Sequence, residues 1–400
     1  MSIRGIYVNL SSENLGVKNK IKSISEALNS NSEISFDLIE PEFSRLDKVI
    51  DDIDYKHYGL SIYSSNKIKY FIEKILLKFS ILKFVRNWLF KKFFFKNLLK
   101  YQINNNINYS IIRYPFANFS LFKFIKSSPS KVFIEFNTFE LEEFKSQNRF
   151  FKISLKYYLE IFLRKKILKV SDGIFGVTNE IIEYQNRFFD ISKKPTFLIS
   201  NCIGLRHNFS IQKKTNSSVN FVILIGEEQP WHGIDRLIFS LEKYPLSTKT
   251  NFYFVGNISS NSHNLINQTS IKNVFFIFLG LVNLNEQIEL LKNVHIGIGS
   301  LCLYRNSMSE ACPLKVRDYA LHGLPVVIGY NDTDLTFNRT LKKFTFQVDN
   351  NESAINFNKV IFWYRQFNHN DLTDFSKNSR NILSYKKKLE PFFDYLKKLE

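Results

Sequence analysis

The sequence predicts an α/β protein made of two doubly wound domains, each built on a parallel sheet. Its 400 residues are enough for two domains with full cores. Short apolar, β-branched runs alternate with segments of helical periodicity, which is typical of βαβ units. A polar stretch at 201–219 interrupts this alternation, which restarts at Asn220. We therefore expect two domains that face each other across a ligand-binding cleft, with the carboxyl ends of the strands toward it.

The predicted strands follow one another through both halves of the chain. They cover 4–10, 35–40, 109–115, 131–137 and 173–178 in the first half, and 220–226, 251–257, 273–280, 294–300 and 324–329 in the second. A helix is expected near 18–29, after the first strand. The expected division is a first domain over 1–202, a linker over 203–219, a second domain over 220–375, and a helical segment over 376–400 that crosses back to the first domain.

Composition and charge narrow the class of protein. The chain is 44% hydrophobic and 23% charged, which is typical of a globular protein and not of a disordered one. Its net charge of +18 favours an anionic partner: an acidic small molecule, an anionic membrane or a nucleic acid. The three cysteines show neither a disulfide framework nor metal-ligand spacing, so we expect a reducing, cytoplasmic setting. Neither a signal peptide nor a transmembrane helix is expected.

One segment, 67–100, carries half of the net charge. It has ten basic residues and a single acid, Glu73, and we expect two helices in it. On a helical wheel one side gathers the basic residues Lys74, Lys78, Arg86, Lys92, Lys96 and Lys100, and the other side is apolar. Such a segment is either a surface helix with a solvated lysine face or a docking site for an anionic membrane surface. A second basic stretch at 162–169 would extend that docking site.

The stretch "SEACPLKVRDYALHGLPVVIG", residues 309–329, carries the strongest chemical signal. Pro313 predicts a helix start and Gly323 its end, between two buried strands. The first turn exposes the N–H groups of Leu314, Lys315 and Val316, which with the helix dipole form an anion site. The acids on either side, Glu310 and Asp318, would repel an anion but suit hydroxyl groups flanking it. A nucleotide-sugar has that chemistry, although an isolated pair of acids can also be a loop acid and a helix-surface charge.

This stretch resembles the donor-binding motif of GT-B glycosyltransferases of family 4, also called group 1. In that family two glutamates are separated by seven residues, and the match implies that Glu310 contacts the donor sugar and Asp318 the ribose. Asp318 is one methylene shorter than the glutamate of the family, so its contact would be weaker or water-mediated. The resemblance implies the GT-B fold, with two Rossmann-like domains facing across a cleft. It makes the first domain the acceptor-binding domain and the second the nucleotide-sugar-binding domain.

A second stretch, "GEEQPWHGIDRLI" from Gly226 to Ile238, resembles the segment of that family that grips the diphosphate. The family usually has an arginine and a lysine where this chain has Glu227 and His232, a departure that we interpret as a Trp-His-Gly variant. His232 binds phosphate well only when protonated, and it could instead be a capping or packing residue. Arg236 could supply the missing charge. Near the N-terminus Gly16 matches a glycine that lets the backbone approach a phosphate.

The stretch 131–144 occupies the place where many members of the family carry a histidine, which this chain lacks. We expect Glu135, Asn137 and Thr138 to line the acceptor cleft. In the retaining chemistry of the family the leaving diphosphate helps to deprotonate the acceptor, so stabilising its charge is the main catalytic contribution. We therefore expect Glu310 and His232 to act in catalysis, and neither a metal nor a resident cofactor.

The resemblance implies a retaining, metal-independent hexosyltransferase. Its co-substrate would be a nucleotide-diphosphate sugar of UDP or GDP type, and its acceptor a lipid-linked saccharide or other oligosaccharide of a bacterial surface polysaccharide. We expect it at the inner face of the cell membrane, as a peripheral protein that binds no nucleic acid. Three alternatives stay open: a non-catalytic GT-B-like binding subunit, a nucleotide-sugar epimerase, and a nucleic-acid binder suggested by the net charge.

Overall fold

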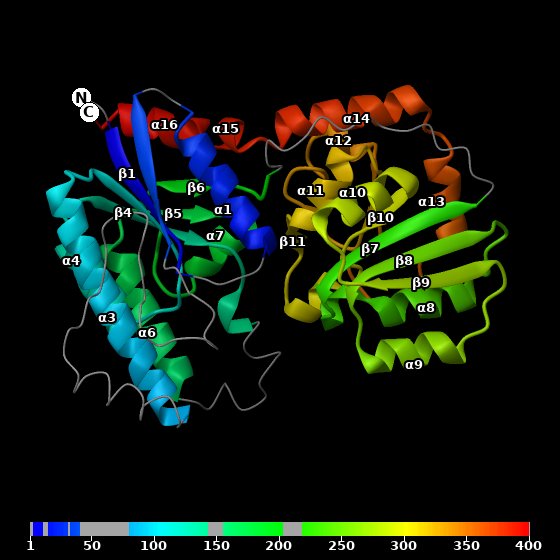
Figure 1. Ribbon diagram of the computed structural model, residues 1–400, viewed down its shortest axis with the longest axis horizontal. Coiled ribbons are helices and arrows are strands. Elements are labelled where there is room, and N and C mark those ends of the chain that lie inside the picture. Colours follow the sequence, from blue (N-terminus) through cyan, green and yellow to red (C-terminus); the bar gives the residue numbers. More distant parts are fainter. Residues whose placement is uncertain are drawn as a thin grey trace. The chain divides into compact units, whose positions relative to one another are not determined.

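The computed structural model describes residues 3–10, 15–30, 33–40, 80–142, 155–202 and 218–399. Within it the chain forms two compact units (Figure 1). The first unit comprises Met1–Gly176 and Ile181–Leu198, and the second comprises Val177–Glu180 and Ile199–Glu400. Four residues that follow a strand of the first unit therefore pack with the second. Most of the predicted linker, 203–217, lies outside the described residues.

The first unit is built on a six-stranded parallel sheet in the order β2-β1-β3-β4-β5-β6. Its strands are β1 (Ile3–Val8), β2 (Ile34–Ile39), β3 (Tyr109–Arg113), β4 (Lys131–Phe136), β5 (Gly173–Gly176) and β6 (Thr196–Leu198). The central strands are buried along almost their whole length, as in β4, where only Lys131 is exposed. Continuous apolar runs suit this position because helices cover both faces of a parallel sheet.

The helices of the first unit divide between the two faces of its sheet. They are α1 (Leu15–Leu28), α3 (Ser80–Asn104), α4 (Phe119–Ser127), α6 (Leu155–Val170) and α7 (Asn179–Gln185). The connections that contain α3, α4 and α6 all step along the sheet in one direction, and the connection through α1 steps in the other. Since such crossovers are right-handed, α3, α4 and α6 cover one face and α1 covers the opposite face.

The second unit has a six-stranded parallel sheet in the order β14-β12-β10-β7-β8-β9. Its strands are β7 (Val219–Glu227), β8 (Thr250–Asn257), β9 (Val274–Gly280), β10 (Ile296–Ile298), β12 (Val326–Ile328) and β14 (Thr345–Gln347). A two-stranded parallel ladder joins β11 (Glu310–Ala311) to β13 (Asn331–Asp332). Stacked rings of Phe221 and Phe252, with centroids 4.9 Å apart, lie in the core of this unit.

Helices connect the strands of the second unit, and four of them follow its last strand, β14. They are η2 (Pro230–His232), α8 (Ile234–Lys243), α9 (Ser260–Gln268), α10 (Leu284–Asn293), η3 (Leu303–Asn306), α11 (Leu314–Leu321), α12 (Arg339–Lys342), α13 (Phe357–Tyr364), α14 (His369–Ile382), α15 (Tyr385–Lys388) and α16 (Glu390–Lys397). Side-chain caps start several of them: Asn283 accepts from Glu286 N at 3.0 Å to begin α10. Over the described ranges, none of the helices combines the length and hydrophobicity needed to cross a bilayer.

All ten predicted strands are present, as β1–β5, β7–β10 and β12. The sequence reading missed β6 and β14, each of three residues, and the two-residue ladder strands. Of the two helices expected in 67–100, the structure describes α3, which runs unbroken from Ser80 to Asn104; 67–79 lies outside the described residues, so the other helix stays a prediction. The expected boundary at 375/376 falls inside α14, and the return of the last segment to the first domain stays a prediction.

Candidate functional site

The start of α11 forms the centre of the candidate site in the second unit. Pro313 has the extended backbone of a helix cap, α11 begins at Leu314, and Gly323 (φ +65°) follows it in the left-handed conformation. The N–H of Val316 was expected to be open to a ligand. It instead donates to Pro313 O at 3.1 Å. The expected anion site is therefore smaller, with the N–H groups of Leu314 and Lys315 as its backbone donors.

Glu310 lies just before this helix, in β11, where it pairs with Asn331 of β13. The residue is 8% exposed, and burial raises the pKa of its carboxyl group. Its Oε2 accepts from the backbone N–H of Glu180 at 3.0 Å. Its Oε1 is buried and makes no hydrogen bond to any residue that the structure describes. One carboxylate oxygen is therefore anchored, and the other keeps acceptor capacity near the hydroxyl group of Thr333.

Glu180, in the first turn of α7, returns this contact. Its carboxylate accepts from Ser309 N at 2.9 Å, Ser309 Oγ at 3.0 Å and Glu310 N at 2.8 Å. The two glutamates thus bind each other's backbone, and this reciprocal contact fixes the loop that carries Glu310. Sequence reasoning missed Glu180 because an acid in the first turn of a helix is an ordinary partner of the helix dipole.

A buried cluster of charges fixes the other side of the same ladder. Arg317 of α11 is 1% exposed and donates to Asp332 Oδ2 at 2.6 Å, to Asp334 Oδ2 at 2.7 Å and to Asn201 O at 2.7 Å. Lys388 also contacts Asp334. Because Asp332 belongs to β13, this cluster holds α11 in place against the ladder that presents Glu310.

Beside the helix start, Lys315 supplies positive charge and His232 supplies a hydrogen-bond donor. Lys315 Nζ is buried and makes no hydrogen bond to the described part of the chain, and burial lowers the pKa of its ammonium group to about 8. Burial, and then the charge of Lys315, lower the pKa of His232 to about 2. A buried ammonium group needs an acceptor, which an anionic ligand would provide.

His232 is therefore a neutral imidazole in this structure and not the cation that strong phosphate binding was expected to need. Its Nδ1 accepts from Gln229 N at 3.0 Å, so its proton resides on Nε2, which can donate to a ligand oxygen. Two backbone bonds hold the η2 turn in place, from Leu301 N to His232 O at 3.2 Å and from Cys302 N to Trp231 O at 3.1 Å. Gly233 that follows has φ +72°, which favours glycine.

Arg236 does not have the role expected for it. Its buried guanidinium group donates to three backbone carbonyl groups, those of Leu301, Asp349 and Ser353. These bonds occupy the group in the core, so we assign Arg236 to the support of the site and not to the donor. Glu227 accepts from Asn257 Nδ2 at 2.7 Å on the surface. A Cβ at Gly226 would meet nothing within 4 Å, so its backbone is open to a ligand.

Asp318 lies on α11 one turn after Leu314, as expected. Burial raises the pKa of its carboxyl group to about 7. Gln287 of α10 donates to Asp318 Oδ2 at 3.4 Å, a long contact that leaves capacity for a further donor. The side chain is thus positioned to accept from hydroxyl groups, although in a partly protonated state near neutral pH.

The expected acceptor residues lie in the first unit, at the end of β4. Glu135 is buried, accepts from Lys20 Nζ at 3.0 Å and from the hydroxyl group of Tyr7, and has a lowered pKa despite its burial because Lys20 and Arg113 are close. Lys20 also contacts Asn137. Glu135 is therefore bound into the sheet, whereas Asn137 and Thr138 are half-exposed. Gly16 lies in the first turn of α1 and not in the loop where it was expected.

Of the expected docking residues, the structure describes the side chains of Lys92, Lys96 and Lys100, and all three are exposed. Lys74 and Lys78 lie outside the described residues, as does the side chain of Arg86.

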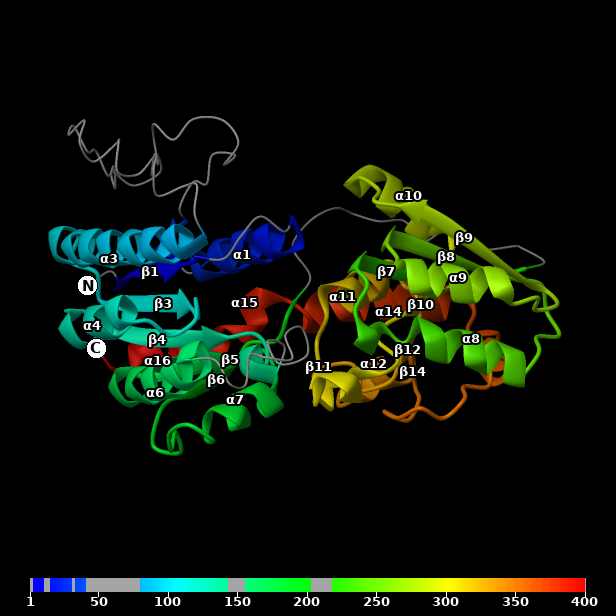
Figure 2. The ribbon, with the colours of Figure 1, turned by 90° about the horizontal axis from the view of Figure 1, so that it is seen from below.

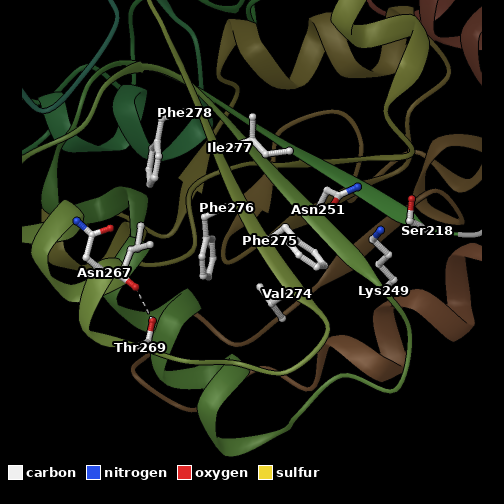
Figure 3. Close-up of a pocket in the computed structure, with 11 residues that line it drawn as sticks. Ser218, Lys249, Asn251, Asn267, Thr269, Val274, Phe275, Phe276, Ile277 and Phe278 are labelled. Atoms are coloured by element: carbon white, nitrogen blue, oxygen red, sulfur yellow. Dashed lines mark hydrogen bonds between the residues drawn. The ribbon is translucent and has the colours of Figure 1, made fainter.

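A pocket of about 610 Å³ in the second unit is a separate feature (Figure 3). It is lined by the starts of β7 and β8, by β9 and by α9, and not by the loop of Glu310. We assign no donor site there, since ligands of parallel sheets bind at the carboxyl ends of strands.

Comparisons with known proteins support this fold. No family model and no curated protein matches the chain. Solved structures do match: a glycosyltransferase from Rickettsia africae (TM-score 0.60, 14% identity, 99% of this chain and 98% of that one) and a sucrose-phosphate synthase from Thermosynechococcus elongatus (TM-score 0.61, 10% identity, 99% of both chains). Anabaena HepE in complex with UDP also matches (TM-score 0.56, 10% identity, 99% of this chain and 100% of that one).

The matches extend to a putative UDP-N-acetylglucosamine 2-epimerase from Listeria monocytogenes (TM-score 0.50, 10% identity, 99% of this chain and 96% of that one). Together with the two six-stranded parallel sheets, these likenesses show the GT-B fold. Identities of 10–14% show the fold alone. Membership of family 4 and of its Trp-His-Gly branch stays a prediction.

Proposed function

We propose that this protein is a glycosyltransferase that moves a hexosyl group from a nucleotide-diphosphate sugar to a saccharide acceptor. The observation that carries the proposal is the buried Nζ of Lys315 at the start of α11, between Glu310 and Asp318, which has no hydrogen-bond partner among the described residues. A diphosphate would pair with this ammonium group and with the N–H groups of Leu314 and Lys315. The two acids would then accept from hydroxyl groups at its ends. Such a donor, of UDP or GDP type, would supply an acceptor for Lys315 Nζ and donors for the two acids.

In the proposed reaction the sugar leaves the diphosphate with retention of configuration and without a metal. The leaving diphosphate gains negative charge, which Lys315, the N–H groups at the start of α11 and Nε2–H of His232 would stabilise. Glu310, with Oε2 anchored by Glu180, would orient the sugar through its free Oε1. The acceptor would lose its proton to the leaving diphosphate, since no separate base is assigned.

The proposed acceptor is a lipid-linked saccharide or other oligosaccharide of a bacterial surface polysaccharide. The proposed place of action is the cytoplasmic side of the cell membrane, where the protein would bind peripherally. The net charge of +18 and the exposed lysines of α3 support an anionic surface as partner. Asn137 and Thr138, half-exposed at the end of β4, are the proposed acceptor contacts in the first unit.

The first test is donor binding. A panel of UDP- and GDP-sugars is screened for thermal stabilisation of the full chain, because a ligand that binds the folded state raises the melting temperature. Transfer is then measured with the selected donor. Glu310→Ala should abolish transfer with an unchanged melting temperature, and Glu242→Ala, at an exposed position of α8, is the matched control. Normal turnover by Glu310→Ala would refute the assignment.

A nucleotide-sugar epimerase is the second candidate, because the fold also matches a putative epimerase. Incubation of the protein with the selected nucleotide-sugar in the absence of acceptor separates the two functions. Conversion of the sugar to its epimer indicates the epimerase, whereas transfer that requires an acceptor indicates the transferase. A non-catalytic subunit would bind the donor or a partner protein and yield neither product.

A further inference from the structure

Three helices of the first unit form one continuous layer over a face of its sheet. α4 lies between α3 and α6 and packs against both (Figure 2). We call the solvent-exposed sides of these three helices the basic face. Its residues are far apart in the sequence, so the layer joins basic stretches that a helical wheel of 67–100 cannot bring together.

On α3 the basic face consists of a lysine stripe. Lys92, Lys96 and Lys100 are exposed at i, i+4 and i+8, while Phe94 and Leu98 are buried against the unit. Like charges at this spacing repel each other and weaken the helix. The stripe therefore does not serve folding, which favours a role in binding a partner of opposite charge.

On α6 the basic face combines lysines with aromatic rings. Lys165, Lys166 and Lys169 are exposed on the same side as Tyr158 (62% exposed) and Phe162 (50% exposed). Lys166 Nζ lies 4.3 Å from the centre of the Phe162 ring. Large exposed rings beside lysines are typical of surfaces that insert into the headgroup region of a bilayer.

The short helix α4 fills the space between the two stripes. Lys123 and Lys126 are exposed on it, as is Phe119 at its start (47% exposed). Lys166 Nζ of α6 lies 5.8 Å from the ring of Phe122, which links α6 to α4. The basic face thus carries cations on each of its three helices, interleaved with apolar side chains.

Acidic residues are absent from this face. Among the described residues of the three helices the only acid is Glu160, which is 4% exposed. Glu160 forms a buried ion pair with Arg164, whose Nη2 lies 2.9 Å from Glu160 Oε1. Arg164 Nη1 lies 3.1 Å from Glu140 Oε2. These buried pairs anchor α6 and leave its outer side with positive charge alone.

We propose that the basic face docks on the surface of a bilayer that contains anionic phospholipids. The lysines would bind headgroup phosphates, each strengthening partition by up to about five-fold. The rings of Phe119, Tyr158 and Phe162 would enter the boundary between headgroups and acyl chains. The exposed apolar side chains favour a bilayer over a nucleic acid, because a duplex backbone offers no apolar phase. This inference deepens the proposed function by naming the docking surface, and rests on it only for the lipid-linked acceptor.

The test is flotation of the full chain with vesicles of phosphatidylcholine, with and without 30% phosphatidylglycerol, at about 0.1 M and 0.5 M salt. We expect binding to the anionic vesicles only, weakened at least ten-fold by the higher salt. Lys96→Glu, Lys123→Glu and Lys166→Glu combined should weaken binding at least 30-fold. The control, Lys342→Glu, Lys359→Glu and Lys386→Glu combined, makes the same change of net charge at exposed positions of the second unit and should alter binding less than three-fold. Phe162→Ser should remove the binding that remains at high salt.

Several outcomes would overturn the inference. One is equal binding to neutral and anionic vesicles, and another is an equal loss in both triple variants, which would mean that net charge alone acts. A third is tighter binding to duplex DNA or RNA with no binding to vesicles. Donor-induced thermal stabilisation separates this inference from the proposed function, since it should be unchanged in the Lys96, Lys123 and Lys166 variant. Vesicle binding without any donor binding would sink the transferase and leave the docking surface intact.

Discussion

Removal of the Glu180 carboxylate should disorder the loop of Glu310 and slow transfer without unfolding the protein. Glu180→Ala leaves three donors without their acceptor: Ser309 N, Ser309 Oγ and Glu310 N. Hydrogen bonds to a charged group contribute about 1.5–3 kcal/mol each when buried. This loop is partly exposed and water can replace some of them, so we expect a total of about 2 kcal/mol. If that energy orders Glu310 for catalysis, kcat/KM should fall about 30-fold.

The assay is initial-rate kinetics at varied donor concentration, with thermal unfolding measured on the same samples. The loss should lie mainly in kcat, since the proposed role of Glu310 is to orient the reacting sugar, while the proposed diphosphate contacts are unchanged. Glu180→Gln keeps one acceptor oxygen and should recover part of the rate. Glu183→Ala, at an exposed position one turn further along α7, is the control. Wild-type kcat/KM in Glu180→Ala, or a loss that matches a drop in melting temperature, would refute the positioning role.

Three further predictions concern the same unit. Burial lowers the pKa of Lys315 from 10.5 to about 8, so donor affinity measured by calorimetry should fall above pH 8. Lys315→Met should bind the donor weakly and without this fall. The unfolded chain keeps the Lys315 proton up to about pH 10.5, so the same group makes folding more favourable as the pH rises from 8 to 10.5. Arg317→Met leaves Asp332 and Asp334 without their shared cation, and it should reduce the free energy of unfolding by about 3–5 kcal/mol in urea titrations. The control, Arg339→Met at an exposed position, should change this free energy little. Gly226→Ala meets open space and should leave the melting temperature unchanged while raising the Kd of the donor about ten-fold; an unchanged Kd would show that no ligand approaches there.

The sequence predicted what depends on local chemistry. Pro313 and Gly323 set the bounds of α11 because proline has a fixed φ and no N–H, while glycine tolerates the left-handed conformation that follows a helix; long apolar runs located the central strands. The three-residue strands β6 and β14 escaped because so few residues show no periodicity.

The errors at the site come from contacts between residues far apart in the chain. In the sequence Arg236 looks like a free cation, but in the structure it donates to the carbonyl groups of Leu301, Asp349 and Ser353. The lowered pKa of His232 comes from burial and then from Lys315, which is more than 80 residues away in the sequence. Glu180 meets Ser309 and Glu310 across about 130 residues. No local sequence pattern predicts the contacts of Arg236, the protonation state of His232 or the contacts of Glu180.

The membership of Val177–Glu180 in the second unit limits how this protein can be dissected. A fragment that begins after the polar stretch at 201–219 would contain β7 and everything that follows, and would look complete from the strand pattern. It would nevertheless lack the carboxylate that holds Ser309 and Glu310, and the carbonyl group of Val177 that accepts from Cys312 Sγ at 3.1 Å. If the second unit binds the donor as proposed, this fragment should bind nucleotide yet hold its sugar loosely, and a peptide spanning 177–180 supplied in trans should tighten it.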